Sequence, residues 1–306
     1  MLVTMKHKYF FLSLMLFFCL SGFAQSRLFF TTITTRDGLP NASVSAIVQD
    51  KLGFLWFGTQ NGLARYDGYK FKVYENDPFL DNVLAHSQVQ TLFMDGDILW
   101  IGTYGGLSKL DLKTDKITNY QHEENNPDSL NANLVVSIGK DNKGRLWIGT
   151  SIGIDRFDEN TGKFYHYIQP NNTQGLPSCM IRDIHCDKQG NLWIGTHGQG
   201  LWKYDYTSDS FIVVSSGIME KSGLPSQYVM SIAEDSSGTL WFGTWFGGIS
   251  RLIDRNTNQF ETIKLDDDRI YFINAQLDGQ IVAGTWGGGL FLYDTTPKTT
   301  SRYTTS

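Results

Sequence analysis

The 306-residue sequence has few cysteines, few prolines and no cluster of basic residues. It contains three cysteines and seven prolines, and its formal net charge is -5. A nucleic-acid-binding protein normally presents a basic surface, because neutralising phosphate groups supplies much of its affinity. No Lys/Arg run is present. We therefore do not expect a nucleic-acid-binding protein, although scattered arginines would still permit a site for a polyanion.

The cysteine positions argue against a disulfide framework. Cys19 lies in the apolar N-terminal segment, which leaves Cys179 and Cys186. On one extended strand these two residues would be roughly 23 Å apart, at ~3.3 Å per residue, which is far beyond disulfide reach. We expect two free, buried thiols, and a fold that depends on its hydrophobic core.

One long hydrophobic run is present, and it lies at the N-terminus. Lys6, His7 and Lys8 precede the apolar segment Tyr9–Leu20, and small residues follow up to Ala24. This three-part pattern predicts an export signal peptide at residues 1–24, and therefore an exported protein. The alternative is an uncleaved anchor, but the run is short of the ~20 apolar residues that span a bilayer.

A Leu-Trp-x-Gly-Thr motif recurs along the remaining chain. Five complete copies occupy residues 55–59, 99–103, 146–150, 192–196 and 240–244, and a degenerate sixth occupies residues 281–285. The tryptophans follow one another at intervals of 44, 47, 46 and 48 residues. Periods of ~40–50 residues that contain several short strands are typical of β-propellers.

Each repeat contains four segments of strand character. A β-branched run leads into an Asp-x-x-Gly turn, whose Asp caps the turn and whose Gly supplies a positive φ. The Trp motif is the second strand, and a third strand ending in Asp and a polar fourth strand follow. The predicted fold class is therefore all-β, a propeller of four-stranded blades with six repeats visible. The blades are expected at about 41–76, 84–121, 131–168, 177–214, 225–263 and 268–304, within a domain at 28–306.

The recurrence of Trp, Gly and Thr at the same positions of each repeat is explained most simply by packing. A large indole ring at one place in every repeat predicts a wedge between neighbouring blades. We expect the Gly to permit a close approach, and the Thr to form a hydrogen bond to a neighbouring strand.

The two ends of the domain raise the question of ring closure. Residues 28–34 have the character of an outer strand without its own blade, and such a strand commonly closes a ring by pairing with the last blade. The sixth repeat, however, has a possible fourth strand of its own around Tyr303. We favour an incomplete seven-bladed ring whose last blade lies beyond this chain. The alternative is a closed six-bladed ring with residues 296–306 as a loose tail.

The combined pattern resembles the two-component regulator propeller repeat. The shared motifs are Gly-Leu-Pro-x-x-x-Val, Asp-x-x-Gly-x-Leu-Trp-x-Gly-Thr and x-x-Gly-Leu-x-x-Tyr-Asp. Residues 38–67 match almost throughout, and the resemblance extends over residues 28 to about 294. The sixth repeat departs from it at Val282 and Ala283, and the second has a shortened turn at residues 95–97.

The resemblance implies a periplasmic input domain of a hybrid two-component system of the kind found in Bacteroidetes. In that family, seven-bladed propellers often come in pairs, followed by a β-sandwich, a membrane helix and a histidine kinase. Many members respond to oligosaccharides. The resemblance thus implies an oligosaccharide or other small ligand, a second propeller or sandwich domain and a homodimer partner in the full-length protein. The kinase is not part of this chain, so we expect no enzyme activity here.

Side chains just after each Gly-Thr are the best candidates for a binding site. They fall in turns on a rigid scaffold, which is where binding residues usually lie. Tyr104, His197, Trp245 and Trp286 are large or polar where packing does not demand it. Aromatic faces beside an imidazole group suit a sugar ring, which can stack and form hydrogen bonds. The alternative is that these rings fill space between blades.

Catalytic and metal-binding signatures are scarce. No His-Glu-x-x-His or Gly-x-Ser-x-Gly motif occurs. The acidic run at residues 266–268 is interpreted as solvated, and we expect no metal or cofactor. Two other functions stay open: a carbohydrate-active propeller enzyme, either lyase or hydrolase-like, and a scaffold for protein docking or dimerisation.

Overall fold

The computed structural model describes residues 30–77, 79–167, 175–216, 223–277, 279–296 and 298–304. The predicted signal peptide at residues 1–24 lies outside these ranges. Over the described residues, the chain forms β-strands and the short 3-10 helix η1 (Thr35–Asp37), and no helix there is long and apolar enough to cross a membrane. Residues 30–34 are in no strand and belong to a unit separate from residues 35–306. The closing outer strand at residues 28–34 stays a prediction.

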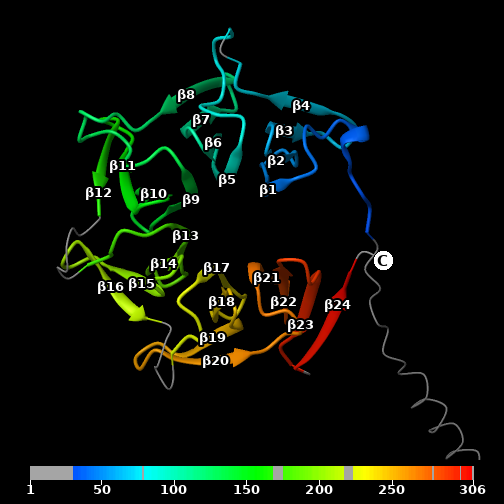
Figure 1. Ribbon diagram of the computed structural model, residues 1–306, viewed down its shortest axis with the longest axis vertical. Coiled ribbons are helices and arrows are strands. Elements are labelled where there is room, and N and C mark those ends of the chain that lie inside the picture. The colour runs from blue at the N-terminus through cyan, green and yellow to red at the C-terminus, as the bar shows by residue number, and fades with distance from the viewer. Residues whose placement is uncertain are drawn as a thin grey trace, which may run out of the picture. The chain divides into compact units, whose positions relative to one another are not determined.

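The second unit consists of six four-stranded antiparallel sheets, which form the blades of a ring (Figure 1). The predicted all-β propeller with six repeats is confirmed. Blades 1 to 3 contain β1 (Val44–Gln49), β2 (Leu55–Thr59), β3 (Gly62–Tyr66), β4 (Phe71–Tyr74), β5 (Val89–Asp95), β6 (Ile98–Thr103), β7 (Gly106–Asp111), β8 (Lys116–Tyr120), β9 (Val135–Lys140), β10 (Leu146–Thr150), β11 (Ile154–Asp158) and β12 (Lys163–His166). Blades 4 to 6 contain β13 (Ile181–Cys186), β14 (Leu192–Thr196), β15 (Leu201–Asp205), β16 (Ser210–Ser215), β17 (Val229–Glu234), β18 (Leu240–Thr244), β19 (Gly248–Asp254), β20 (Gln259–Ile263), β21 (Ile270–Leu277), β22 (Gln280–Thr285), β23 (Leu290–Asp294) and β24 (Thr299–Tyr303).

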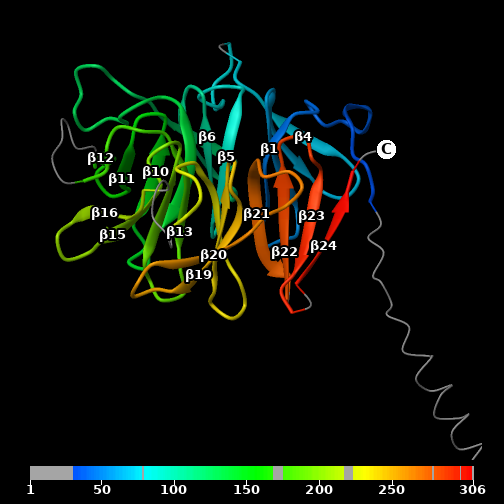
Figure 2. The same cartoon turned by 60° about the horizontal axis from the view of Figure 1, so that its bottom comes forward.

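The first strand of each blade lies nearest the centre of the ring (Figure 1). Figure 2 shows that the strands run between two ends of the ring, so that the turns gather at these ends. The Asp-x-x-Gly turns, which join first to second strands, lie at one end. The turns after Gly-Thr, which join second to third strands, lie at the other end, where the inner strands begin.

The Asp-x-x-Gly turns hold the tryptophans in place. In blade 3, Asp141 Oδ1 accepts hydrogen bonds from the backbone N–H groups of Lys143 and Arg145 at 2.9 and 3.0 Å. The predicted turn cap is confirmed. Asp141 Oδ2 also accepts a hydrogen bond from Trp147 Nε1 at 3.0 Å. The same indole–carboxylate bond joins Trp56 to Asp50, Trp193 to Asp187 and Trp241 to Asp235.

Each of these tryptophans packs against the inner strand of the next blade. Trp147 is fully buried and belongs to one hydrophobic cluster with Ile184 and Leu192 of blade 4. Trp56, Trp100, Trp193 and Trp241 join blade to blade in the same way. Truncating a buried Trp costs about 3–5 kcal/mol, so these wedges are a major source of stability. The predicted packing role is confirmed.

Gly and Thr of the motif have the predicted structural roles. A Cβ atom added to Gly58 would lie 2.6 Å from Val89 Cγ1 of the next blade, so only Gly permits the approach. Thr103 Oγ1 donates a hydrogen bond to the carbonyl of Gly106 at 2.8 Å. That hydroxyl therefore links the second strand to the start of the third.

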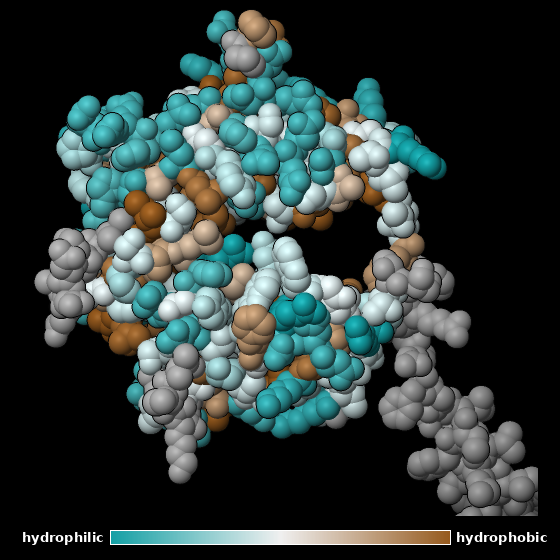
Figure 3. Space-filling view, in the orientation of Figure 1, coloured by the Kyte–Doolittle hydropathy of each residue, from teal (hydrophilic) through white to brown (hydrophobic). Residues whose placement is uncertain are grey.

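Blades 1 and 6 each have a sheet face that no other blade covers among the described residues. Ile47 of β1 is 57% exposed, whereas its counterpart Ile138 in β9 is 7% exposed. Across the gap, Phe272 of β21 is 52% exposed. A Cβ atom on Gly284 would approach only Phe272 of its own blade. Figure 3 shows that the open centre of the ring continues between these two blades.

The C-terminal segment differs from one sequence-based alternative. Thr299–Tyr303 form β24, which pairs with β23 as the fourth strand of blade 6. The expectation of a loose tail over residues 296–306 is therefore wrong for this segment, because its backbone completes the antiparallel ladder.

Cys179 and Cys186 are free thiols, as predicted, but both are only half-buried, whereas buried thiols were expected. Burial raises the pKa of Cys179 to about 12, so the thiol is protonated and unreactive at neutral pH. The expectation that both cysteines share one strand is wrong, because β13 begins at Ile181. Cys179 instead lies in the segment that enters blade 4, where its N–H donates to the carbonyl of Ile152 in blade 3.

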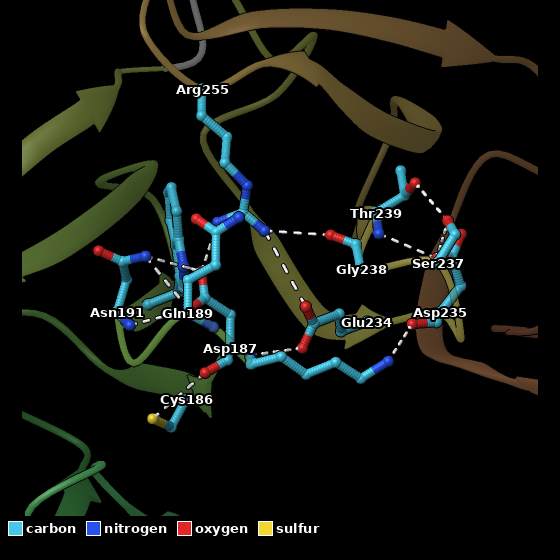
Figure 4. A network of polar contacts seen from close by, with 12 residues as sticks. Cys186, Asp187, Gln189, Asn191, Glu234, Asp235, Ser237, Gly238, Thr239 and Arg255 are labelled. Atoms are coloured by element: carbon cyan, nitrogen blue, oxygen red, sulfur yellow. Dashed lines mark hydrogen bonds and ion pairs between the residues drawn. The ribbon is translucent and has the colours of Figure 1, made fainter.

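A polar network joins blades 4 and 5 at the Asp-x-x-Gly end (Figure 4). Arg255 of blade 5 donates through Nη1 to Asp187 Oδ2 at 2.5 Å and through Nη2 to the carbonyl of Gly238 at 3.1 Å. Lys188 of blade 4 donates through its backbone N–H to Glu234 Oε2 at 2.8 Å. Since the carboxylate of Asp187 is fully buried, Arg255 neutralises a charge that would otherwise be costly to bury.

Candidate functional site

The turns after Gly-Thr occur in two lengths. In blades 1 to 3 the Thr hydroxyl bonds to a carbonyl three residues later, as from Thr59 to Gly62. In blades 4 to 6 it bonds to a carbonyl four residues later, as from Thr196 to Gly200. The longer turns begin with His197, Trp245 and Trp286. Three of the four predicted site residues thus occupy the longer turns of three consecutive blades.

Trp245 and Trp286 form an aromatic cluster with Tyr271. The two indole rings have a centroid distance of 5.7 Å, and Tyr271 lies 6.4 Å from Trp245 and 5.8 Å from Trp286. Trp286 is 59% exposed and Tyr271 40% exposed. These rings contact one another, but part of their surface stays exposed to solvent. They therefore do not simply fill the space between blades.

Phe246 extends this cluster and has an unusual backbone. Its ring lies 5.9 Å from Trp245, and it is 61% exposed. Its φ is +68°, at the turn position where blades 4 and 6 have Gly198 and Gly287. A bulky residue in this left-handed region costs of order 1–3 kcal/mol, and such strain is found preferentially at functional sites.

Tyr271 and Arg182 reach the site through β-bulges. Each inner strand has a bulge near its start, and Arg182 and Tyr271 are the extra residues of β13 and β21. The Arg182 guanidinium carbon lies 5.1 Å from the Tyr271 ring centroid, although blade 5 separates their blades along the chain. Bulges re-aim side chains, and here two of them direct side chains from blades 4 and 6 toward each other.

His197 borders the same site. Its ring lies 4.8 Å from that of Tyr228, which immediately precedes β17 of blade 5. The pKa of His197 is lowered, first by burial and then by the positive charge of Arg182. His197 is therefore neutral at pH 7, with one ring nitrogen as donor and the other as acceptor. The field of Arg182 extends over the turn of blade 4.

We call Arg182, His197, Tyr228, Trp245, Phe246, Tyr271 and Trp286 the mouth cluster. They lie where the inner strands of blades 4 to 6 begin. Sequence reasoning found three of them but missed the others. The signal for Arg182 and Tyr271 was their place one residue into the inner strand, but a bulge is not visible in a single sequence. The signal for Phe246 was a bulky residue in a turn position that the neighbouring repeats fill with Gly.

Tyr104 is not brought into the mouth cluster. It occupies one of the shorter turns, in blade 2, and its ring lies 6.2 Å from that of His86. It is 48% exposed, and no described contact joins it to His197, Trp245 or Trp286. The four predicted residues therefore do not form one site in this structure.

A second region with polar side chains lies at the outer edges of blades 3 and 4. A cavity of about 470 Å³ there is lined by Arg156, His166 and Asp209 among others. His166 Nδ1 lies 2.7 Å from Asp155 Oδ1, and its Nε2 lies 2.9 Å from the carbonyl of Pro127. Both ring nitrogens are thus occupied by protein groups, which indicates a structural role for this histidine.

Metal ligation finds no support in the part of the chain that the structure describes. No group of three or more His, Cys, Asp or Glu side chains there is arranged to hold a metal ion. The mouth cluster instead offers aromatic faces, a guanidinium group and a neutral imidazole. Groups of these kinds can stack on a ligand and form hydrogen bonds with it.

Comparison with known sequences identifies the repeats. The sequence profile of the two component regulator propeller family matches residues 38–61, 129–151, 175–198 and 223–246. A histidine kinase of Formosa agariphila is 49% identical over 53 residues, which is 17% of this chain and 4% of the kinase.

Solved structures give a consistent result. The extracellular domain of a proposed hybrid two component system of B. thetaiotaomicron is 28% identical, with a TM-score of 0.55 over 86% of this chain and 41% of its own. The extracellular domain of a proposed one component system of the same organism is 21% identical, with a TM-score of 0.72. The match covers 91% of this chain and 38% of that domain's chain. The chain thus spans less than half the length of these solved domains.

Proposed function

We propose that this chain, which carries the repeats of the two-component regulator propeller family, is the exported, periplasmic ligand-sensing input domain of a two-component signalling protein. The resemblance to extracellular domains of such systems supports a sensory role, and the match to a histidine kinase supports a link to phosphorelay signalling. The kinase, any second propeller or sandwich domain and the homodimer partner would belong to the full-length protein.

We infer that the ligand is an oligosaccharide and that it binds at the mouth cluster. The observation that carries this proposal is the cluster of partly exposed aromatic side chains formed by Trp245, Tyr271 and Trp286. Stacking on such rings contributes binding energy without requiring a catalytic group. No paired catalytic carboxylates or activated nucleophile stand beside these rings among the described contacts, so binding is favoured over turnover.

Thermal-shift measurements with a panel of oligosaccharides test the proposal. A ligand that binds only the native state raises the melting temperature, because it stabilises that state by mass action. We expect at least one oligosaccharide to raise it, and the double variant Trp245→Ala/Trp286→Ala to lose the shift. Both side chains are partly exposed, so the variant should fold.

Tyr104→Ala is the matched control, because Tyr104 is an exposed aromatic residue in the equivalent turn of blade 2. We expect this variant to keep the shift. A shift that survives the double variant but is lost in Tyr104→Ala would move the site to blade 2. A panel that produces no shift in the unmodified protein would argue for the docking-scaffold function instead.

A further inference from the structure

Arg182 is the cationic group of the mouth cluster, and its charge has no carboxylate partner among the described residues. Its Nε atom is buried without a hydrogen-bond partner, and Nη1 approaches only Met180 Sδ, at 3.8 Å. By contrast, Arg145, Arg251, Arg255 and Arg269 each form an ion pair with an Asp or Glu side chain.

The neighbouring acid, Asp183, does not provide this partner. Its Oδ2 accepts a hydrogen bond from the Ile232 backbone N–H at 2.6 Å, and its Oδ1 accepts one from the Ile184 N–H at 2.8 Å. Burial raises the pKa of Asp183, and the backbone hydrogen bonds and the charges of His185 and Arg182 oppose this rise. Asp183 thus ties blade 4 to blade 5 and leaves the guanidinium of Arg182 available.

The guanidinium lies beside the aromatic faces. It is 5.1 Å from the Tyr271 centroid, and Tyr271 contacts both Trp245 and Trp286. Burial and then the positive charge of Arg182 lower the pKa of His197, so the field of the guanidinium reaches the turn of blade 4. A planar guanidinium binds oxyanions through two parallel hydrogen bonds, and a partly desolvated one does so strongly.

We propose that Arg182 makes the mouth cluster selective for acidic oligosaccharides, with a carboxylate or sulfate group of the ligand on the guanidinium and a sugar ring on the aromatic faces. This inference rests on the proposed sensory function and adds the chemical class of the ligand. Carboxylate and sulfate share the oxyanion geometry that the site recognises. The nature of the anion is decided by experiment.

Calorimetry with matched sugar pairs tests the selectivity. The first pair is a uronic-acid trisaccharide and its methyl ester, and the second is a sulfated galactose disaccharide and its unsulfated parent. We expect the purified chain to bind at least one acidic member more tightly than its neutral partner. Arg182→Gln should weaken binding of that member by about 10- to 100-fold, the usual value of hydrogen bonds to a charged group, and weaken binding of the neutral partner much less.

Arg156→Gln is the matched control. Arg156 also stacks on a tyrosine ring, Tyr165, and also forms no ion pair with any described residue, but it lies at the outer edge of blade 3. We expect it to bind the acidic sugar normally. Loss of binding in Arg156→Gln alone would place the anion in the cavity at the outer edges of blades 3 and 4 and overturn the proposal.

A second readout does not depend on folding stability. The pKa of His197 is lowered first by burial and second by the charge of Arg182. An anion on Arg182 cancels the second of these effects, so NMR titration of the imidazole should show a higher pKa with the acidic sugar than with its neutral partner. If neutral and acidic sugars bind equally and Arg182→Gln changes neither affinity, this inference fails and the sensory function stands. If no sugar binds at all, both fail.

Discussion

Phe246 combines a strained backbone with an exposed side chain. This combination predicts that the residue lowers the stability of the fold and is retained for ligand binding. Replacing it with Gly, the residue of blades 4 and 6, removes the strain of its +68° φ. We expect Phe246→Gly to leave the free energy of unfolding unchanged or raise it by about 1 kcal/mol, because relief of strain offsets the backbone entropy of Gly. Urea unfolding checks the stability. Lower stability in the variant would contradict the view that Phe246 is retained for function.

Trp100 provides a natural control for the indole–carboxylate bonds. Its turn is shortened at residues 95–97, and its buried Nε1 has no hydrogen-bond partner among the residues that the structure describes. We expect Trp147→Phe to cost about 1–3 kcal/mol more than Trp100→Phe, because only the former leaves a buried carboxylate, that of Asp141, without its indole donor. Denaturation of the two variants measures this difference. Equal losses would show that the bond contributes nothing beyond packing.

At the residue scale, the sequence was sufficient to assign the repeated Trp, Gly and Thr because each recurs at a fixed position in a repeated environment. It was not sufficient to assign Arg182 or Tyr271. Their roles depend on a bulge that turns one side chain out of the ladder, and on the proximity of blades 4 and 6. Neither of these is encoded in local spacing.

At the scale of elements, the link between blades 4 and 5 predicts a pH-dependent stability. Burial alone would raise the pKa of Asp187, but hydrogen bonds from Trp193, Arg255 and Asn191 outweigh it and lower the pKa below 3.8. The contribution of the Arg255 link is therefore present above pH 3.8 and is lost as the pH falls through the lower pKa of the folded protein.

Arg255→Gln tests this link. We expect it to lower the free energy of unfolding at pH 7 by about 1–3 kcal/mol, as for the loss of a hydrogen bond to a charged group. The difference from the unmodified protein should shrink at pH 3. Chemical denaturation at the two pH values measures it. A difference that stays constant would mean that the loss comes from packing of the arginine side chain.

The turn length is an element-scale feature that the sequence contained. Between the Gly-Thr pair and the Gly that precedes Leu or Ile, blades 4 to 6 have three residues, whereas blades 1 to 3 have two. This signal alone would have separated Tyr104 from His197, Trp245 and Trp286. The composition of these turns does not reveal the difference, whereas the hydrogen bond that closes each turn does.

At the scale of the whole molecule, the exposed faces of blades 1 and 6 bear on ring closure. In this chain we expect Ile47→Lys to cost less than about 0.5 kcal/mol, as for other surface changes, whereas Ile138→Lys buries a charge and unfolds blade 3. If a seventh blade completes the ring in the full-length protein, Ile47→Lys should be strongly destabilising there. Equal tolerance in both contexts would favour the six-bladed ring.

The crystal structure of this chain with a bound acidic oligosaccharide tests the central claim most directly. The account predicts a sugar ring against Trp245 and Trp286 with its anionic group on the guanidinium of Arg182. A ligand seated in the outer cavity beside Arg156 and His166, or between blades 1 and 6, would contradict it.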